Sequence, residues 1–238
     1  MAIIAVQEHY QDLKNIFDTD EMRNIARRGI IHVGADIGQE VPQYLEYGFK
    51  NIVLIEANPK SFKILQAKFG HCENMILLNY AVCESNGAVD FHIHTSRSGN
   101  AEPASVLPMK RFSEIVKTLH TPETIRVPGI TLDSLVASHG IRMTEYNVVN
   151  IDIQGAELLA LRGATKVIAA LDAIISEVNL IEMYENGALE DEIVAFLGGQ
   201  GFEKRHAVYH TLYDETSTFP AWGECLFVRR DLVQRVAP

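Results

Sequence analysis

Apolar and polar positions follow two spacings along this chain, one typical of buried strands and one typical of amphipathic helices. Strands are predicted where apolar residues run together, at residues 30–33, 51–55, 75–78, 148–151, 173–175, 202–209 and 224–228. Helices are predicted where apolar residues return every three or four positions, at residues 39–47, 59–69, 155–163 and 187–198. Strands that alternate with helices at these lengths indicate βαβ units. We therefore expect an α/β fold with a mostly parallel sheet and helices on both of its faces.

Three segments depart from this alternation. Residues 8–28 have helical spacing and predict an N-terminal helical cover over 1–29, whereas residues 89–95 alternate as an edge strand would. Residues 96–128 hold four of the chain's eight prolines, so we expect an insertion or lid over the active site, with a short helix near 111–119. The whole chain, 1–238, is expected to be one domain.

The charges of the expected lid allow two interpretations. Its basic residues outnumber its acidic ones, and they are Arg97, Lys110, Arg111, Lys117 and Arg126. A basic lid would attract an anionic substrate. A solvated surface helix accounts for the same charges, so the sequence alone does not decide between the two.

The composition narrows the class of protein. A formal net charge of −10 argues against a main role in nucleic-acid binding, because phosphate binding needs clustered Lys and Arg. The three cysteines form no CxxC pair, so neither a disulfide framework nor a cysteine zinc site is expected. The first residues lack the pattern of a signal peptide, and no apolar run is long enough to span a bilayer. We expect a cytoplasmic protein with no nucleic-acid partner and no membrane partner.

The turn after the first predicted strand carries candidate binding residues, namely Gly34, Ala35, Asp36 and Gly38. In parallel sheets, ligands bind beyond the carboxyl ends of the strands, and a helix N-terminus there suits a carboxylate or phosphate. Gly34 is expected to allow a close ligand approach, and Gly38 close packing of the following helix. The spacing G-x-x-x-G lacks the second glycine of the dinucleotide fingerprint, so the turn suits the amino-acid end of S-adenosylmethionine better. Asp36 could hold the ammonium group of that ligand, and an ordinary tight turn is the alternative.

Glu56 ends the next predicted strand, eighteen residues after Gly38. A carboxylate in this place can accept hydrogen bonds from both hydroxyls of a ribose. The glycine turn and the distal acid together indicate a nucleoside ligand, without separating NAD from S-adenosylmethionine. A solvated acid in the Asn58-Pro59 turn is the alternative interpretation.

Acidic residues also follow the later strands. Asp152 ends the strand at 148–151, Glu157 lies at the start of the next helix, and Glu177 ends the strand after it. In methyl transfer an oxygen nucleophile must lose a proton, and a carboxylate at this edge could take it. The three acids could instead bind Mg²⁺, which prefers oxygen ligands, or cap backbone N–H groups. Asp152 is the first candidate for the base, and no residue is assigned as a metal ligand.

Several longer motifs occur in order along the chain. They are His32-Val33-Gly34-Ala35-Asp36-Ile37-Gly38, Ile55-Glu56-Ala57-Asn58-Pro59, Asn79-Tyr80-Ala81-Val82 with Asn86-Gly87, Thr131-Leu132-Asp133-Ser134-Leu135, Val149-Asn150-Ile151-Asp152-Ile153-Gln154-Gly155-Ala156-Glu157 and Leu161-Arg162-Gly163-Ala164. With this set, over residues 30–228, the chain resembles the FkbM-type S-adenosylmethionine-dependent methyltransferases. The combination is far more specific than any one motif.

The resemblance implies a Rossmann-like seven-stranded methyltransferase fold with an antiparallel last strand, and S-adenosylmethionine as donor. The residues it implies are Gly34, Ala35 and Gly38 beside the methionine part, Glu56 on the ribose, Ala57, Tyr80 and Ala81 near adenine and ribose, and Asp152 beside the transferred methyl. The chain departs from the family at one position, because Gln154 stands where the family usually has Glu in Asp-x-Glu-Gly. That departure puts in doubt a base or metal role for position 154 and leaves donor binding untouched.

These features favour an enzyme that O-methylates a hydroxyl of a small molecule such as a sugar or natural product. Two other classes stay open. One is an NAD(P)-dependent oxidoreductase, against which the missing glycine counts. The other is a non-catalytic nucleoside-binding module with a methyltransferase-like fold, which Gln154 favours. The expected partner is a small hydroxylated acceptor that the sequence does not name, because acceptor loops vary on a shared fold. A homo-oligomer is compatible with the sequence.

Overall fold

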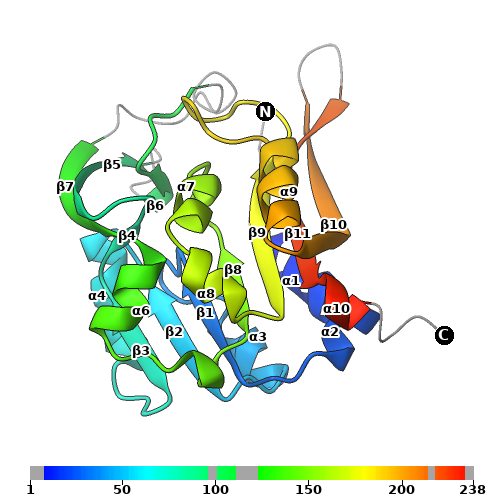
Figure 1. Ribbon diagram of the computed structural model, residues 1–238. Helices are drawn as coiled ribbons and strands as arrows, with labels where there is room; N and C mark the ends of the chain where they lie inside the picture. Colours follow the sequence, from blue (N-terminus) through cyan, green and yellow to red (C-terminus); the bar gives the residue numbers. More distant parts are fainter. Residues whose placement is uncertain (1–7, 96–100, 111–122, 214–217, 234–238) are drawn as a thin grey trace.

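The computed structural model describes residues 8–95, 101–110, 123–213 and 218–233. Its main sheet has seven strands in the order β10-β11-β9-β8-β1-β2-β3 (Figure 1). Their bounds are β1 Gly29–Val33, β2 Asn51–Ile55, β3 Met75–Leu78, β8 Val148–Ile151, β9 Ala173–Asn179, β10 Phe202–Tyr213 and β11 Thr218–Arg229. The five strands from β3 to β9 are parallel, and β11 is antiparallel to both of its neighbours. The expected Rossmann-like sheet with an antiparallel last strand is confirmed.

Helices cover both faces of this sheet, because successive strand residues point to opposite faces. One face carries α6 (Leu132–Ser138), α7 (Glu157–Arg162), α8 (Thr165–Ala169) and α9 (Glu190–Gly199). The other carries α1 (Glu8–Phe17), α2 (Asp20–Asn24), α3 (Val41–Glu46) and α4 (Pro59–Phe69). In β1, Ile31 packs toward the first set and Ile30 toward the second, and neither is exposed. A sheet buried on both sides explains the continuous apolar runs in the sequence.

Local capping chemistry sets the ends of several helices. The helix expected at 59–69 is confirmed, with Pro59 in its first turn and the Asn58 side chain accepting a hydrogen bond from the Lys60 N–H at 3.0 Å. The helix expected at 8–28 is two helices instead. Thr19 breaks it by capping α2, where its hydroxyl accepts from the Met22 N–H at 3.3 Å. A 3₁₀ turn (Met143–Glu145) precedes β8, and α10 (Arg230–Val233) follows β11.

A second sheet has the order β4-β7-β5-β6, with β4 Ala81–Val82, β7 Glu123–Ile130, β5 Gly87–Thr95 and β6 Ala101–Ser105. The expectation of an edge strand at 89–95 is wrong, because β5 lies between β7 and β6. The expected insertion at 96–128 supplies β6 and most of β7. Pro128 hid β7 in the sequence, yet it pairs with Ala88 at a position that β4 does not reach. The short helix expected near 111–119 lies outside the described residues.

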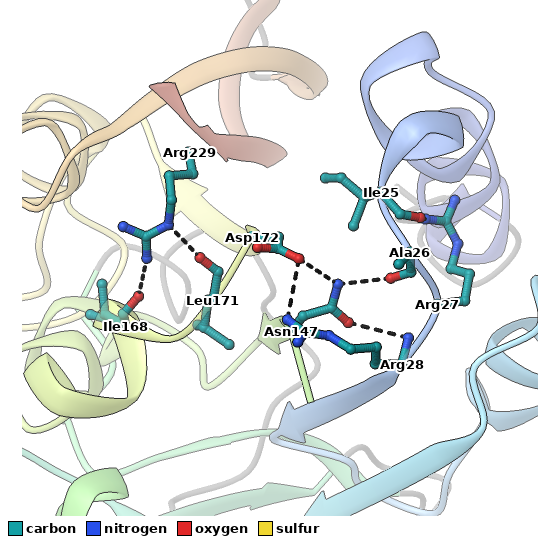
Figure 2. A network of polar contacts seen from close by, with 9 residues as sticks. All are labelled: Ile25, Ala26, Arg27, Arg28, Asn147, Ile168, Leu171, Asp172 and Arg229. Atoms are coloured by element: carbon teal, nitrogen blue, oxygen red, sulfur yellow. Dashed lines mark hydrogen bonds and ion pairs between the residues drawn. The ribbon is translucent and has the colours of Figure 1, made fainter. Parts of the chain in front are cut away.

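Buried polar contacts join the ends of the strands at the edge opposite the candidate site (Figure 2). The side-chain amide of Asn147, which is not exposed, donates hydrogen bonds to the Ala26 carbonyl at 2.7 Å and to the Asp172 carboxylate at 2.8 Å. Arg28 reaches the same carboxylate at 3.4 Å. Nearby, Arg229 donates to the carbonyls of Leu171 and Ile168 at 2.7 Å each. These contacts join the segments that come just before β1, β8 and β9, and so help to align the three strands.

No helix in the described ranges combines the length and the apolar content needed to cross a bilayer.

Candidate functional site

The turn from Gly34 to Gly38 leaves β1 at the carboxyl edge of the main sheet. Gly34 has a φ of +94°, and a Cβ on it would stand 1.8 Å from the carbonyl oxygen of Asp152. A Cβ on Gly38, at φ +79°, would stand 2.5 Å from the ring of Phe69 in α4. The chain therefore needs both glycines for its own packing. Gly34 makes room for β8, and Gly38 makes room for α4 rather than for the following helix.

The backbone of this turn already has internal partners. The N–H groups of Gly34 and Ala35 both donate to the carbonyl of Ile55, at 2.9 and 3.0 Å. Helix α3 begins at Val41, beyond the turn, and it has only six residues. The helix N-terminus that was expected to present free N–H groups to a ligand therefore lies beyond the turn, at Val41. The last residue of β2 thus holds the backbone of this turn in place through two hydrogen bonds.

Glu56, which directly follows β2, also contacts this turn. Its carboxylate accepts hydrogen bonds from the Asp36 N–H at 2.8 Å and from the Asn58 N–H at 2.5 Å. Burial raises the pKa of Glu56 to about 7, against the lowering effect of these two bonds. Each carboxylate oxygen has a second lone pair, so Glu56 can also accept hydrogen bonds from ligand hydroxyls.

Ala57, Tyr80 and Ala81 lie in the segments that follow β2 and β3. Asn79, which sequence reasoning did not single out, donates from its side-chain amide to the carbonyls of Glu56 at 2.7 Å and Ala57 at 3.2 Å. Ala57 packs against the apolar cluster that contains buried Ala81. The ring of Tyr80 stands edge-on to His139 with 5.8 Å between centroids. The structure thus joins Ala57 and Ala81 beside Glu56.

The three acids expected at later strand ends come together. One carboxylate oxygen from each of Asp152, Glu157 and Glu177 lies within 4.8 Å of the others. Asp152 is partly exposed, whereas Glu157 and Glu177 are buried. Glu224 of β11, also buried, stands opposite Glu177 in the antiparallel ladder. Sequence reasoning missed Glu224, because strand register cannot be read from one strand alone.

Burial dominates the electrostatics of this acid cluster, by which we mean Asp152, Glu157, Glu177 and Glu224. It raises the pKa of Glu157 to about 7, with the charge of Asp152 adding to the effect. It also raises the pKa of Glu177 well above its ordinary value, again helped by the neighbouring acids. Glu157 also holds the loop after β8, since its Oε1 accepts from the N–H groups of Ile153 at 3.0 Å and Gly155 at 3.1 Å. Its Oε2 is buried with no hydrogen-bond partner.

Gln154 lies between the acids. Its amide NH₂ donates to Asp152 at 2.8 Å and to Glu177 at 3.2 Å, and its Oε1 accepts from the Tyr184 hydroxyl at 2.6 Å. The Gln154 NH₂ group therefore occupies the place between Asp152 and Glu177 where a cation that bridges these two carboxylates would bind. This arrangement does not fit Mg²⁺, which the sequence raised as a candidate cofactor, because the ion would have to displace the amide.

A polar network lies beneath the acid cluster on the α3 side of the sheet. Tyr44, which is not exposed, accepts from the Asn150 amide at 2.8 Å, and its hydroxyl lies 3.1 Å from His32 Nδ1. His32 is itself packed inside β1, with 1% of its surface exposed. These side chains fill the space under the ends of β1 and β8.

The strand order is that of a Rossmann-like fold of the methyltransferase class. The turn that Glu56 contacts and the acids after β8 lie at the carboxyl edge of its sheet. The chain belongs to the family of the methyltransferase FkbM domain, whose model matches residues 32–204. This confirms the family resemblance. Membership of this family supports S-adenosylmethionine-dependent methylation.

Solved methyltransferase structures are similar to this chain at low sequence identity. The methyltransferase domain of bacterial CtHen1-C is 9% identical with a TM-score of 0.50, covering 94% of this chain and 97% of that one. The magnesium protoporphyrin IX methyltransferase of Synechocystis PCC 6803, solved with bound SAM, is 11% identical with a TM-score of 0.49, covering 96% and 86%. No curated protein sequence matches the chain.

Proposed function

We propose that the protein transfers a methyl group from S-adenosylmethionine to a hydroxyl oxygen of a small acceptor, such as a sugar or natural product. One observation carries the proposal. Asp152, a partly exposed acid, directly follows β8 and lies against Gly34 of the glycine turn. A base must stand beside the donor's reactive end and still reach the acceptor, and its partial exposure beside the glycine turn supports Asp152 in this role.

The glycine turn and Glu56 would together bind the donor. Gly34, Ala35, Asp36 and Gly38 would border the methionine part, with Asp36 toward its ammonium group. Glu56 would accept from the ribose hydroxyls, because its carboxylate is already oriented by two backbone N–H groups. Ala57, Tyr80 and Ala81 would flank the adenine.

S-adenosylmethionine supplies a methyl group activated by its positively charged sulfur. Asp152 would take the proton of the acceptor hydroxyl while the new O–C bond forms and the C–S bond breaks. S-adenosylhomocysteine and the methylated acceptor are the products, and the proton then passes from Asp152 to solvent. Glu157 and Glu177, which are buried and have raised pKa values, would act from behind Asp152 by shaping its field.

An apolar cluster beside Gln154 supports an acceptor with an apolar or ring face. Leu107, Met109 and Phe219 pack, partly buried, against a cluster of buried residues that contains Tyr184. The segment after β6 reaches this place because the Ser105 hydroxyl donates to the Ile153 carbonyl at 3.4 Å. That contact supports the proposal that part of 96–128 overhangs the site.

The basic lid receives no such support from the described residues. Lys110 pairs with Glu182 at 2.6 Å, and Arg126 pairs with Asp90 at 3.1 Å. Arg97, Arg111 and Lys117 lie outside the described residues. We therefore base the acceptor proposal on the apolar cluster and leave the lid's charge as a separate hypothesis.

Calorimetry of the purified protein with S-adenosylmethionine, S-adenosylhomocysteine and NAD⁺ tests the donor. We expect micromolar binding of both sulfur compounds and none of NAD⁺. Methyl-labelled donor, offered with hydroxylated sugars and ring compounds with and without EDTA, then tests the reaction. Donor binding without transfer to any acceptor would favour the non-catalytic module, and no binding of either sulfur compound by folded protein would overturn the proposal.

A further inference from the structure

Gln154 donates to two carboxylates at once, and we infer that it is a positioning residue that holds the Asp152 carboxylate in place and stabilises negative charge in the acid cluster. The assignment of Asp152 as base rests on the proposed function. The effect of Gln154 on the charge of the cluster does not, and it can be measured without donor or acceptor.

The geometry of the amide carries the first step. The two N–H bonds of one NH₂ group point to Asp152 at 2.8 Å and Glu177 at 3.2 Å. A neutral amide cannot give up its protons, unlike an acid that shares a proton with its neighbour. Gln154 therefore stabilises negative charge on both partners while adding no charge of its own.

Tyr184 fixes which end of the amide meets the acids. Its hydroxyl, buried with the rest of the side chain, donates to Oε1 of Gln154 at 2.6 Å. In the flipped orientation, Oε1 would face two carboxylates and the NH₂ group would face Tyr184. The ring also lies against the backbone, because a Cβ on Gly155 would stand 2.5 Å from it.

The backbone of Gln154 has an unusual conformation that directs its side chain. Its φ is +58°, a conformation that residues other than glycine rarely adopt. This bend turns the side chain back between the ends of β8 and β9, where both carboxylates lie. The neighbouring turn is supported independently by Glu157, which accepts from the N–H groups of Ile153 and Gly155.

The acidic groups around Asp152 explain why a hydrogen-bond donor such as the Gln154 amide is needed among them. Glu157 of α7, Glu177 of β9 and Glu224 of β11 all bring acidic charge to this place, and the phenols of Tyr44 and Tyr184 are buried nearby. Burial first, and the like charges of the neighbouring acids second, raise the pKa of Glu177 well above its ordinary value. A Glu at position 154 would have the same shape, remove both donors and add another acid. Such a cluster would have to bind a proton or a cation, so the choice of Gln sets the charge state.

Thermal unfolding of the full chain between pH 5 and pH 8 tests the inference. The variants are Gln154→Glu, Gln154→Met and Tyr184→Phe, with Ile193→Val in the apolar core as a matched control. Losing the hydrogen bond from Gln154 raises the pKa of Glu177 in the folded state, so these variants lose further stability as pH rises through that pKa. We expect the Tm deficit of both Gln154 variants to grow from pH 5 to pH 8, by about 3–5 °C per pKa unit.

Tyr184→Phe should show the same trend more weakly, because it frees the amide without removing it. Ile193→Val should lose the same amount at every pH. A deficit in all three variants that does not change with pH would reduce Gln154 to a packing role and overturn the inference. If the Gln154 variants do not fold, Tyr184→Phe alone decides. A failure to bind S-adenosylmethionine would overturn the proposed function and leave this result unaffected.

Discussion

The Cα of Gly34 and the carbonyl oxygen of Asp152 are so close that a Cβ on Gly34 would stand 1.8 Å from that oxygen. The contact arises because β1 and β8 are neighbours in the sheet, and the Asp152 N–H donates to the Val33 carbonyl at 3.0 Å. It joins the turn that would hold the donor to the acid that would serve as base. Movement of one must displace the other.

Gly34→Ala should therefore cost about 2–5 kcal/mol of unfolding free energy. About 1–2 kcal/mol comes from a side chain at positive φ, and about 1–3 kcal/mol from the overlap. Gly48→Ala is the matched control, since Gly48 has a φ of +84° with no atom near its missing Cβ. Urea unfolding of both variants separates the terms. Equal losses would show that backbone conformation, and not the contact with Asp152, makes Gly34 necessary.

The parts of the fold that the sequence predicted are those set by local chemistry. Pro59 and Asn58 mark the start of α4, and apolar runs mark strands covered on both faces. The residues after β1, β2, β8 and β9 were placed by one rule, that parallel strands end at the same edge. The same rule placed Asp152 near Glu177.

The missed parts depend on contacts between distant segments. Pro128 and its neighbours suggested a loop, but Pro128 pairs with β5 at a position that β4 does not reach. Glu224 joins the acids through the register of β11 on β9. Tyr184 meets Gln154 across thirty residues of sequence, so its role follows only from the folded chain.

Donor affinity should rise between pH 6 and pH 8, because Glu56 has a pKa of about 7 and its ionised form is the better acceptor for ribose hydroxyls. At pH 6 about one tenth of Glu56 would be ionised, so S-adenosylmethionine should bind about ten-fold more weakly than at pH 8. Calorimetry across this range measures the effect. Glu56→Gln should bind weakly at every pH, and exposed Glu73→Gln should keep the wild-type slope. A slope that survives in Glu56→Gln would assign the titration to another acid, such as Glu157.

Asp152→Asn should lower turnover by about 10²- to 10⁴-fold once an acceptor is known, because the amide cannot take the hydroxyl proton. Its shape is nearly unchanged, so the dissociation constant for the donor should stay within about two-fold of wild type. Single-turnover transfer of labelled methyl measures the first quantity, and calorimetry the second. Asp90→Asn, which breaks an exposed ion pair on the second sheet, should leave turnover unchanged. Wild-type turnover in Asp152→Asn would remove the base assignment.

Glu157→Gln should flatten the dependence of stability on pH. The pKa of Glu157 is raised to about 7 by burial, so the folded chain holds a proton that the unfolded chain releases above pH 4.5. Stability is therefore present at pH 4.5 and lost as pH rises through 7, by up to about 3 kcal/mol for this one group. The amide stays neutral, and its oxygen can still accept from Ile153 and Gly155. Urea unfolding at pH 5, 6, 7 and 8 should show a smaller decline than in wild type or Glu73→Gln, and an unchanged decline would mean that Glu157 keeps its charge in the fold.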